Sequence, residues 1–558
     1  MKLILRFALM GSVMGLVGFA SGAYAQDTRP TPVSTERPGQ IDLMRSGPSG
    51  ALMISLDEAI SLALERNPSL VVEKIHLEQA RERVREEKGR YDPLFNFRGY
   101  FSSRDNIVAS RFYPTGLYVD TDQSSSAGVE LRTYSGGKFN IGLDFRRLNS
   151  TSNTQTLSPQ YSSNLTFAFT QSLLRDFGRT ANTTRIQIAQ KAEEVADRNL
   201  FQRVSELVQQ IEGAYWNLVF LQQNLDYKRR SLEAARNLLN QSRDLFAAGR
   251  VAQVSVLEAR AGVASREEEL ITAENEVHRF EDRMKLLLWV DLDTPGFVAL
   301  DQESLDKVDL NADRSLLIAL QRRPELQGLQ KELEQRQAET RFAANQTLPR
   351  LDLVGQYGTS GLSGLPNLTC VDPTASLCVP VGASIGSSVF ADQNKGVDAL
   401  SSLFLHNYNN WSVELKLQIP LGNRSAKAQL ADANLRALEA NTRLNALRDQ
   451  IALEIRDAIR ETQTAQKRID AARENITFLN EQLDDARKRF EAGLASSYEV
   501  LQVFDDLDRA KANELKAIMD FRVGQSKLRL AEASVLDKYD IEMKKPPRYT
   551  FEPRNLTR

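Results

Sequence analysis

The chain has 558 residues, and its 71 Lys and Arg nearly balance its 73 Asp and Glu, so the formal net charge is −2. This balance argues against a nucleic-acid-binding protein, which needs a basic face. Apolar residues make up about 45% of the chain, an ordinary value for a folded protein, and neither disorder nor a collagen-like repeat is indicated. Only 18 Pro and 30 Gly are present, which favours long helices.

The first 25 residues have the parts of a secretory signal peptide. Lys2 and Arg6 make the start positive, residues 7–20 form an apolar run, and Ala23-Tyr24-Ala25 is an A-x-A cleavage site. No cysteine follows the site, so a lipid anchor is not indicated. No later stretch approaches the ~20 apolar residues of a membrane helix. We therefore expect an exported chain that can cross a membrane only as β-strands.

The rest of the chain repeats one pattern twice. Ala63-Leu64-x-Arg66-x-Pro68 recurs as Ala319-Leu320-x-Arg322-x-Pro324, and Phe246-x-x-Gly249 recurs at a smaller offset as Phe490-x-x-Gly493. The helical parts thus keep their length while the middle segment of the first copy is longer, as expected of rigid rods that carry variable loops. The predicted organisation is a signal peptide (1–25), an N-terminal periplasmic extension (26–53), repeat 1 (54–290), a linker (291–311), repeat 2 (312–536) and a C-terminal periplasmic tail (537–558).

Each copy contains a long helix with a heptad seam. Apolar residues alternate at spacings of four and three from Leu200 to Leu225, and again from Ile451 to Phe490. This period is typical of coiled-coil packing, and an ordinary long coiled coil would explain the seam equally well. Each rod is predicted to have about 65 residues, or roughly 100 Å. Shorter helices flank the rod, at residues 56–91 and about 254–288 in the first copy.

The middle segments alternate as β-strands do. We predict strands at 94–101 and 164–170 in the first copy, and at 351–357 and 411–419 in the second. Alternation of this kind fits a membrane barrel, although a soluble hairpin gives the same pattern. A further candidate hairpin covers residues 129–145, and the sequence assigns it no role. Two strands per copy make four per chain, which cannot close a barrel, so several chains would have to share one.

Both cysteines, Cys370 and Cys378, lie in a stretch between the second-copy strands that is rich in Gly and Ser. In an exported protein a close, lone pair is most simply a disulfide, which we predict in an externally exposed loop. Metal binding is a poor alternative because no histidine is near in sequence.

No catalytic, cofactor or metal site is indicated. His76, His278 and His406 are scattered along the chain, and the serines have no nucleophile-elbow setting. The numerous Asp and Glu are expected on solvated rods. We therefore predict that the protein is not an enzyme and binds no cofactor.

The chain resembles the TolC-type outer-membrane factor family, the duct proteins of tripartite efflux pumps and type I secretion systems. The resemblance is carried by Leu56-x-x-Ala59-x-x-x-Ala63-x-x-x-x-Pro68, by Pro93 ahead of a strand, by Gln171-x-Leu173-Leu174 running to Gly178, and by the turns Ala248-Gly249 and Ala492-Gly493, each followed seven residues on by Val-Leu. It implies a mainly α, internally duplicated homotrimer in the outer membrane of a Gram-negative bacterium. A twelve-stranded β-barrel would continue into a periplasmic coiled-coil α-barrel.

The resemblance also implies partners and sites. Cargo, either small molecules or proteins, would pass passively from an inner-membrane pump, and a periplasmic adaptor (membrane fusion) protein would dock at the hairpin tips. The adaptor-contacting Gly-Leu element falls on Gly493-Leu494 and, less well, on Gly249-Arg250, where a simple helix cap is the alternative. The periplasmic gate falls on Glu499, and its second ring position falls on the uncharged Gln502. A solvated helix residue is the alternative for Glu499.

A periplasmic coiled-coil adaptor or scaffold is the other function class that the long hairpins allow. An adaptor would normally carry one hairpin with β-rich domains at its base, whereas this chain has two copies of helix, strands, rod and helix. Fractionation separates the two, because only the duct stays in the outer membrane.

Overall fold

The computed structural model describes residues 45–46, 52–109, 116–152, 155–301, 310–366, 368–370, 378–380, 396–404, 408–492 and 494–541. The predicted signal peptide, most of the extension, part of the linker, His406, Gly493 and the end of the tail lie outside the described residues. The chain forms two compact units, and each combines residues from both predicted repeats. The helical unit holds the described residues up to 79, of 196–328 and from 445 on, and the sheet unit holds those of 80–195 and 329–444.

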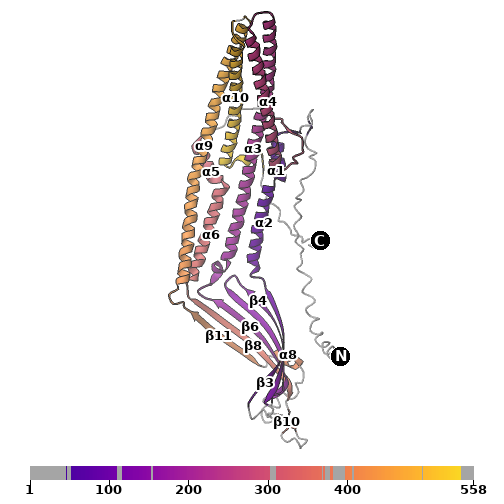
Figure 1. Ribbon diagram of the computed structural model, residues 1–558. Coiled ribbons are helices and arrows are strands. Elements are labelled where there is room, and N and C mark those ends of the chain that lie inside the picture. Colours follow the sequence, from indigo (N-terminus) through magenta and orange to yellow (C-terminus); the bar gives the residue numbers. More distant parts are fainter. Residues whose placement is uncertain are drawn as a thin grey trace, which may run out of the picture. The chain divides into compact units, whose positions relative to one another are not determined.

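The segments assigned to the two predicted repeats form helices of similar length, most of which are labelled in Figure 1. They are α1 (Leu56–Arg66), α2 (Pro68–Gly89), α3 (Gly178–Ala247) and α4 (Gln253–Leu288), followed by α5 (Ala312–Arg322), α6 (Pro324–Gln346), α9 (Arg424–Glu491), α10 (Ser497–Ala531) and the short α11 (Val535–Lys538). The rods α3 and α9 have 70 and 68 residues, which confirms the two long helices. None of the described helices carries an apolar stretch long enough to cross a membrane.

The helix expected over residues 56–91 is in fact two helices. α1 ends at Arg66 and α2 begins at Pro68, because proline suits the first position of a helix and keeps the residue before it out of the α region. That residue, Asn67, is extended, with φ −62° and ψ 122°. Its buried amide donates to the carbonyl of Leu287 at 2.9 Å and so ties the break to α4.

The core of the helical unit packs α1 and the first part of α2 against α3 and α4. A small sheet closes it, in which β2 (Leu52–Ile54) lies between β1 (Arg45–Ser46) and β7 (Phe297–Ala299). Tyr215, fully buried on α3, donates its hydroxyl to the carbonyl of Ile54 at 3.2 Å and accepts from the N–H of Asp301 at 3.1 Å. The rod thereby holds the segment that precedes the helices of the first copy.

A buried carboxylate anchors the end of the described chain to the same rod. Glu212 on α3 accepts hydrogen bonds from Ser526 Oγ at 2.6 Å, Arg529 Nη1 at 3.1 Å and Lys538 Nζ at 2.7 Å. Burial by itself raises the pKa of Glu212, but the cation of Lys538 and the hydrogen bonds outweigh it, and the net pKa is lowered. The carboxylate is therefore held in its charged form, and it fixes α10 and α11 on α3.

The sheet unit holds one antiparallel sheet of six strands. They are β3 (Leu94–Ile107), β4 (Leu117–Arg132), β5 (Gly137–Ser150), β6 (Leu157–Ser172), β8 (Arg350–Pro366) and β11 (Asn409–Gln418), in the order β11-β8-β6-β5-β4-β3 (Figure 1). The prediction of four strands per chain is thus corrected. Among the described residues, the first predicted repeat contributes four strands to this sheet and the second contributes two. The candidate hairpin at 129–145 is the end of β4 and β5 that lies nearest their turn.

Sequence periodicity does not predict the full length of this hairpin because the middle of β4 is polar. Its residues from Asp120 to Ser126 include no large apolar side chain, so no alternation marks them. Hydrogen bonding along the neighbouring strands β3 and β5 makes them a strand nevertheless. Strand identity here comes from the ladder rather than from local pattern.

Short elements lie between β8 and β11. β9 (Leu368–Cys370) and β10 (Cys378–Pro380) pair antiparallel, with Cys370 directly opposite Cys378. α8 (Gly396–Phe404) packs on β6 and β8, where Ser163 Oγ donates to the carbonyl of Ala399 at 2.6 Å. The facing cysteine positions are compatible with the predicted disulfide, which stays a prediction.

We expect native protein to show no reactive thiols under non-reducing conditions, because the strand pairing holds the two cysteines opposite each other in an oxidising compartment. Thiol labelling with and without prior reduction measures this. Two labelled thiols without reduction would contradict the disulfide.

Candidate functional site: the two-faced sheet and the hairpin tips

The strand register gives the sheet one apolar face and one polar face. Directly opposed residues of antiparallel strands share a face. One apolar row crosses all six strands: Phe95, Val129, Ile141, Phe167, Tyr357 and Trp411. All six side chains are exposed, from 36% for Tyr357 to 76% for Trp411. The neighbouring row on the other face is polar or small: Asn96, Gly128, Gly142, Thr166, Gly358 and Asn410. This is the pattern of a wall between lipid and water.

Charged side chains of the sheet pair on the polar face. Arg146 on β5 holds Asp122 on β4 through two nitrogens, with Nη2 2.7 Å from Oδ2. Asp352 on β8 is nearly fully buried and accepts from Arg350 Nε at 2.7 Å and from Ser172 Oγ at 2.9 Å. These charges of the polar face are therefore held in pairs.

The first hairpin tip turns at Gly249. Its φ of +71° lies in the left-handed region, its N–H donates to the carbonyl of Phe246, and the N–H of Arg250 donates to that of Leu245, both at 2.9 Å. These bonds are a Schellman cap, which explains the glycine locally. The second tip has the counterpart of the bond between Arg250 and Leu245: the N–H of Leu494 donates to the carbonyl of Arg489 at 2.8 Å.

The two tips lie side by side in the helical unit. Ser497 at the start of α10 is fully buried, with its Oγ 2.9 Å from the carbonyl oxygen of Ser255 and 2.8 Å from Glu258 Oε2, both on α4. An apolar cluster from α3, α9 and α10, including Phe490, Val500 and the part-buried Leu245, packs around them together with Val251 of the first turn. In contrast to the buried residues of this cluster, Leu494 is 75% exposed. The tip thus presents an apolar side chain to solvent at the predicted docking element.

Glu499 and Gln502, the predicted gate residues, share the exposed face of the first turns of α10. Glu499 Oε1 lies 2.8 Å from Arg489 Nη1 on α9, and Ser496 Oγ caps its backbone N–H. The structure therefore brings the predicted carboxylate against a cation of its own hairpin. Whether this face lines a gate remains a prediction.

A buried polar network, missed in the sequence, joins α3, α4 and α10 farther from the tips. Arg266 is 4% exposed and donates to Asp505 Oδ1 at 2.5 Å and to Ser231 Oγ at 3.2 Å. The Ser231 hydroxyl in turn donates to Asp508. Burial raises the pKa of Asp508, against the opposing effect of its hydroxyl and cationic neighbours.

Asp508 is therefore not one of the ordinary solvated acids that the sequence predicts on the rods, whereas the side chain of Asp505 is 52% exposed. The sequence does contain a signal for the burial of Arg266. This residue lies seven positions from each of two alanines, Ala259 and Ala273, that are buried on the same face of α4. A cation at a heptad position between small residues indicates a buried partner.

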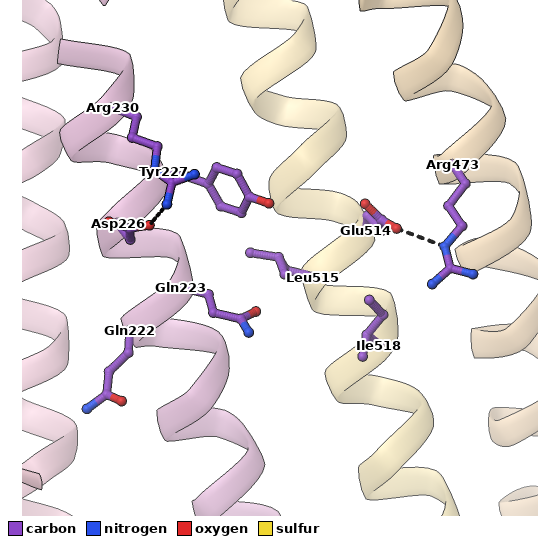
Figure 2. Close-up of a pocket in the computed structure, with 9 residues that line it drawn as sticks. All are labelled: Gln222, Gln223, Asp226, Tyr227, Arg230, Arg473, Glu514, Leu515 and Ile518. Atoms are coloured by element: carbon purple, nitrogen blue, oxygen red, sulfur yellow. Dashed lines mark hydrogen bonds and ion pairs between the residues drawn. The ribbon is translucent and has the colours of Figure 1, made fainter. Parts of the chain in front are cut away.

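A cavity of about 510 Å³ lies between α3, α9 and α10, and Figure 2 shows its lining. Its four charged residues form two pairs, Asp226 with Arg230 at 2.7 Å and Glu514 with Arg473 at 2.9 Å. Because these charges satisfy each other, the cavity is a polar gap between helices rather than a set of groups that converge on a ligand.

The two histidines that the structure describes each lie beside a glutamate of their own helix. His76 lies 3.5 Å from Glu73, and His278 lies 3.4 Å from Glu281, each on its own helix. Within the described ranges, no three His, Cys, Asp or Glu side chains gather closely enough to hold a metal ion.

Comparison with known proteins decides the family. The sequence pattern named outer membrane efflux protein matches residues 132–288 and 316–532, well over half of the chain. The chain belongs to the outer membrane efflux protein family. This efflux protein is accordingly a transport component of the outer membrane of a Gram-negative bacterium that extends into the periplasm, and the TolC-type resemblance is confirmed. The family decides against the periplasmic adaptor. Among curated proteins, none matches the sequence.

Several solved structures have a similar mixed fold of helices and strands. The outer membrane protein VceC of Vibrio cholerae is 17% identical, with a TM-score of 0.58 over 86% of this chain and 95% of that chain. The CmeC outer membrane channel of Campylobacter jejuni is 15% identical, with a TM-score of 0.60 over 86% of this chain and 85% of that chain. The MtrE outer membrane channel of Neisseria gonorrhoeae is 16% identical, with a TM-score of 0.58 over 86% and 89%.

Proposed function

We propose that this efflux protein is the outer-membrane duct of a tripartite pump and works as a homotrimer with a periplasmic adaptor and an inner-membrane pump. The observation that carries the proposal is the six-stranded sheet with an uninterrupted apolar row on one face and a polar row on the other. Such a sheet separates lipid from an aqueous path. Export through it is passive, and energy comes from the inner-membrane partner.

The edges of the sheet support assembly from several copies. β3 and β11 each have a neighbour on one side only, and unpaired backbone groups are costly in lipid. The two edges differ, so copies that join edge to edge use unlike surfaces and close as a ring. Family membership favours three copies. Type I secretion of proteins is the alternative use of the same duct.

Mass measurement of the detergent-solubilised outer-membrane protein tests the assembly, and export by a deletion strain that carries the gene tests the function. The expected result is a stable trimer that restores resistance to compounds that are toxic to the deletion strain. A stable monomer, or a trimer without effect on any compound, would contradict the proposed pump. Secretion of a polypeptide instead would indicate the type I system.

Glu499 is proposed as the gate carboxylate, paired in each chain with Arg489. We expect Glu499→Gln to lower the cation preference of the channel in planar-bilayer conductance, because three carboxylates near one axis attract cations. Arg489→Gln should raise that preference by unmasking the carboxylate. Asp508→Asn serves as the control, since Asp508 is held by Ser231 and should matter less. If neither Glu499→Gln nor Arg489→Gln changes selectivity, Glu499 does not line the gate.

A further inference from the structure

We propose that β4 and β5 are full members of the membrane wall and that β3 of one copy pairs with β11 of the next, so that three chains close a wall of eighteen strands rather than twelve. The inference rests on the proposed trimeric duct and concerns what its wall is built from. Its interaction surface is the pair of open sheet edges, and its partner is a second copy of this chain.

The hairpin is hydrogen-bonded on both sides along most of its length. β4 pairs with β3 from Leu94 to Ile107, and β5 pairs with β6 from Gly137 to Leu148. β3 and β6 are not neighbours. Val129 and Ile141 carry the apolar row through the hairpin without a gap. A wall of four strands per chain would have to break both outer ladders and pair β3 with β6.

The turn of the hairpin is fastened to the helices of the sheet unit. Ser135 accepts the N–H of Gly178 at the start of α3 at 3.1 Å. Tyr134 stacks on Tyr91, just past the end of α2, with ring centroids 4.3 Å apart. Gly136 has φ +91°, and a Cβ there would come within 2.3 Å of the Asp176 carbonyl oxygen. The turn is therefore a fitted part of the wall, not a free loop.

The width of the helical layer agrees with six strands. In the sheet unit, Arg81 and Glu193 join α2 to α3 (3.6 Å), Lys191 and Glu334 join α3 to α6 (2.9 Å), and Thr340 joins α6 to α9 through a 3.3 Å hydrogen bond. Four helices at 8–10 Å spacing span roughly 32–40 Å. Six strands 4.8 Å apart, tilted by 35–45°, span roughly 35–41 Å, whereas four would span only about 23–27 Å.

The open edges are suited to another copy. All ten residues of β11 are exposed, and Trp411 and Phe95 bring the apolar row to both edges. Shortly past β11, Leu435 and Leu438 on α9 are also exposed, at 65% and 61%, three residues apart on one helix face. Because an edge inside lipid must be paired, and the other described edge of the same chain is apolar and equally open, the occupant is a second copy.

Disulfide trapping tests the edge pairing in the full-length protein with Cys370→Ser and Cys378→Ser as background. Arg98→Cys on β3 is combined in turn with Ser412→Cys, Glu414→Cys and Lys416→Cys, which lie on the same polar face of β11. We expect at least one pair to give covalent trimers on non-reducing gels. Gly142→Cys on the central strand β5, with the same partners, is the matched control and should give none.

End-on electron micrographs of the solubilised protein test the strand count. Eighteen strands predict a backbone wall roughly 36 Å across, and twelve predict about 24 Å, because diameter grows linearly with strand number. A narrow wall, cross-linking at Gly142→Cys, or no β3–β11 cross-link in a protein whose mass is trimeric would each overturn the eighteen-strand proposal while leaving the trimer standing. A monomeric mass would instead overturn the proposed function.

Discussion

Leu494→Asp is expected to abolish export while the assembled channel stays in the outer membrane. Leu494 is 75% exposed at the second hairpin tip, beside a packed apolar cluster, so its side chain contributes little to folding and is free to enter a partner. A carboxylate buried without a partner in an apolar contact costs several kcal/mol, enough to lower the population of docked complex by a hundredfold or more. The measurement is resistance of the complemented deletion strain.

Two variants sharpen this result. Leu494→Met keeps an apolar side chain of similar volume and should export normally. Gly493→Asp, at the predicted partner position of the docking element, should fail as Leu494→Asp does. Each variant is also tested for trimer mass and outer-membrane location. Normal export by Leu494→Asp, at normal abundance, would remove the docking role from this tip.

Glu212→Gln is expected to loosen the end of the described chain by about 3 kcal/mol, because Lys538 and Arg529 lose their buried counter-charge. Breaking a buried ion pair costs about 3–5 kcal/mol, and we expect the lower value because the side chains of Lys538 and Arg529 are 32% and 20% exposed. Hydrogen exchange of α11 and the last turns of α10 should accelerate by roughly a hundredfold in the solubilised channel. Glu206→Gln, which breaks an exposed pair with Arg203, is the control and should change exchange little.

The same carboxylate makes this anchor sensitive to pH. The folded pKa of Glu212 lies below its unfolded value, so its stabilisation is complete above the ordinary carboxyl range of about 4.3 and is lost as pH falls through the folded pKa. Exchange at α11 should therefore accelerate in acid for the native chain but hardly for Glu212→Gln. Equal exchange in both proteins at neutral pH would show that the buried pair does not hold α11.

Features that depend on local pattern could be predicted from the amino-acid sequence. The rods α3 and α9, the turn at Gly249 and the family follow from heptads, glycine caps and repeated motifs, each of which acts over a few residues. The break before Pro68 also has a local signal, since proline at a first helical position ends one helix and starts the next.

Features that depend on contacts between distant segments could not be predicted in this way. The polar middle of β4 is a strand because β3 and β5 supply its hydrogen bonds, so six strands rather than four emerge from pairing and not from alternation. Glu212 and Arg266 look like ordinary rod charges until partners from α10 and α11 lie against them, hundreds of residues away in sequence. Local periodicity carries no information about such partners, because burial of a charge is set by whichever helix packs over it.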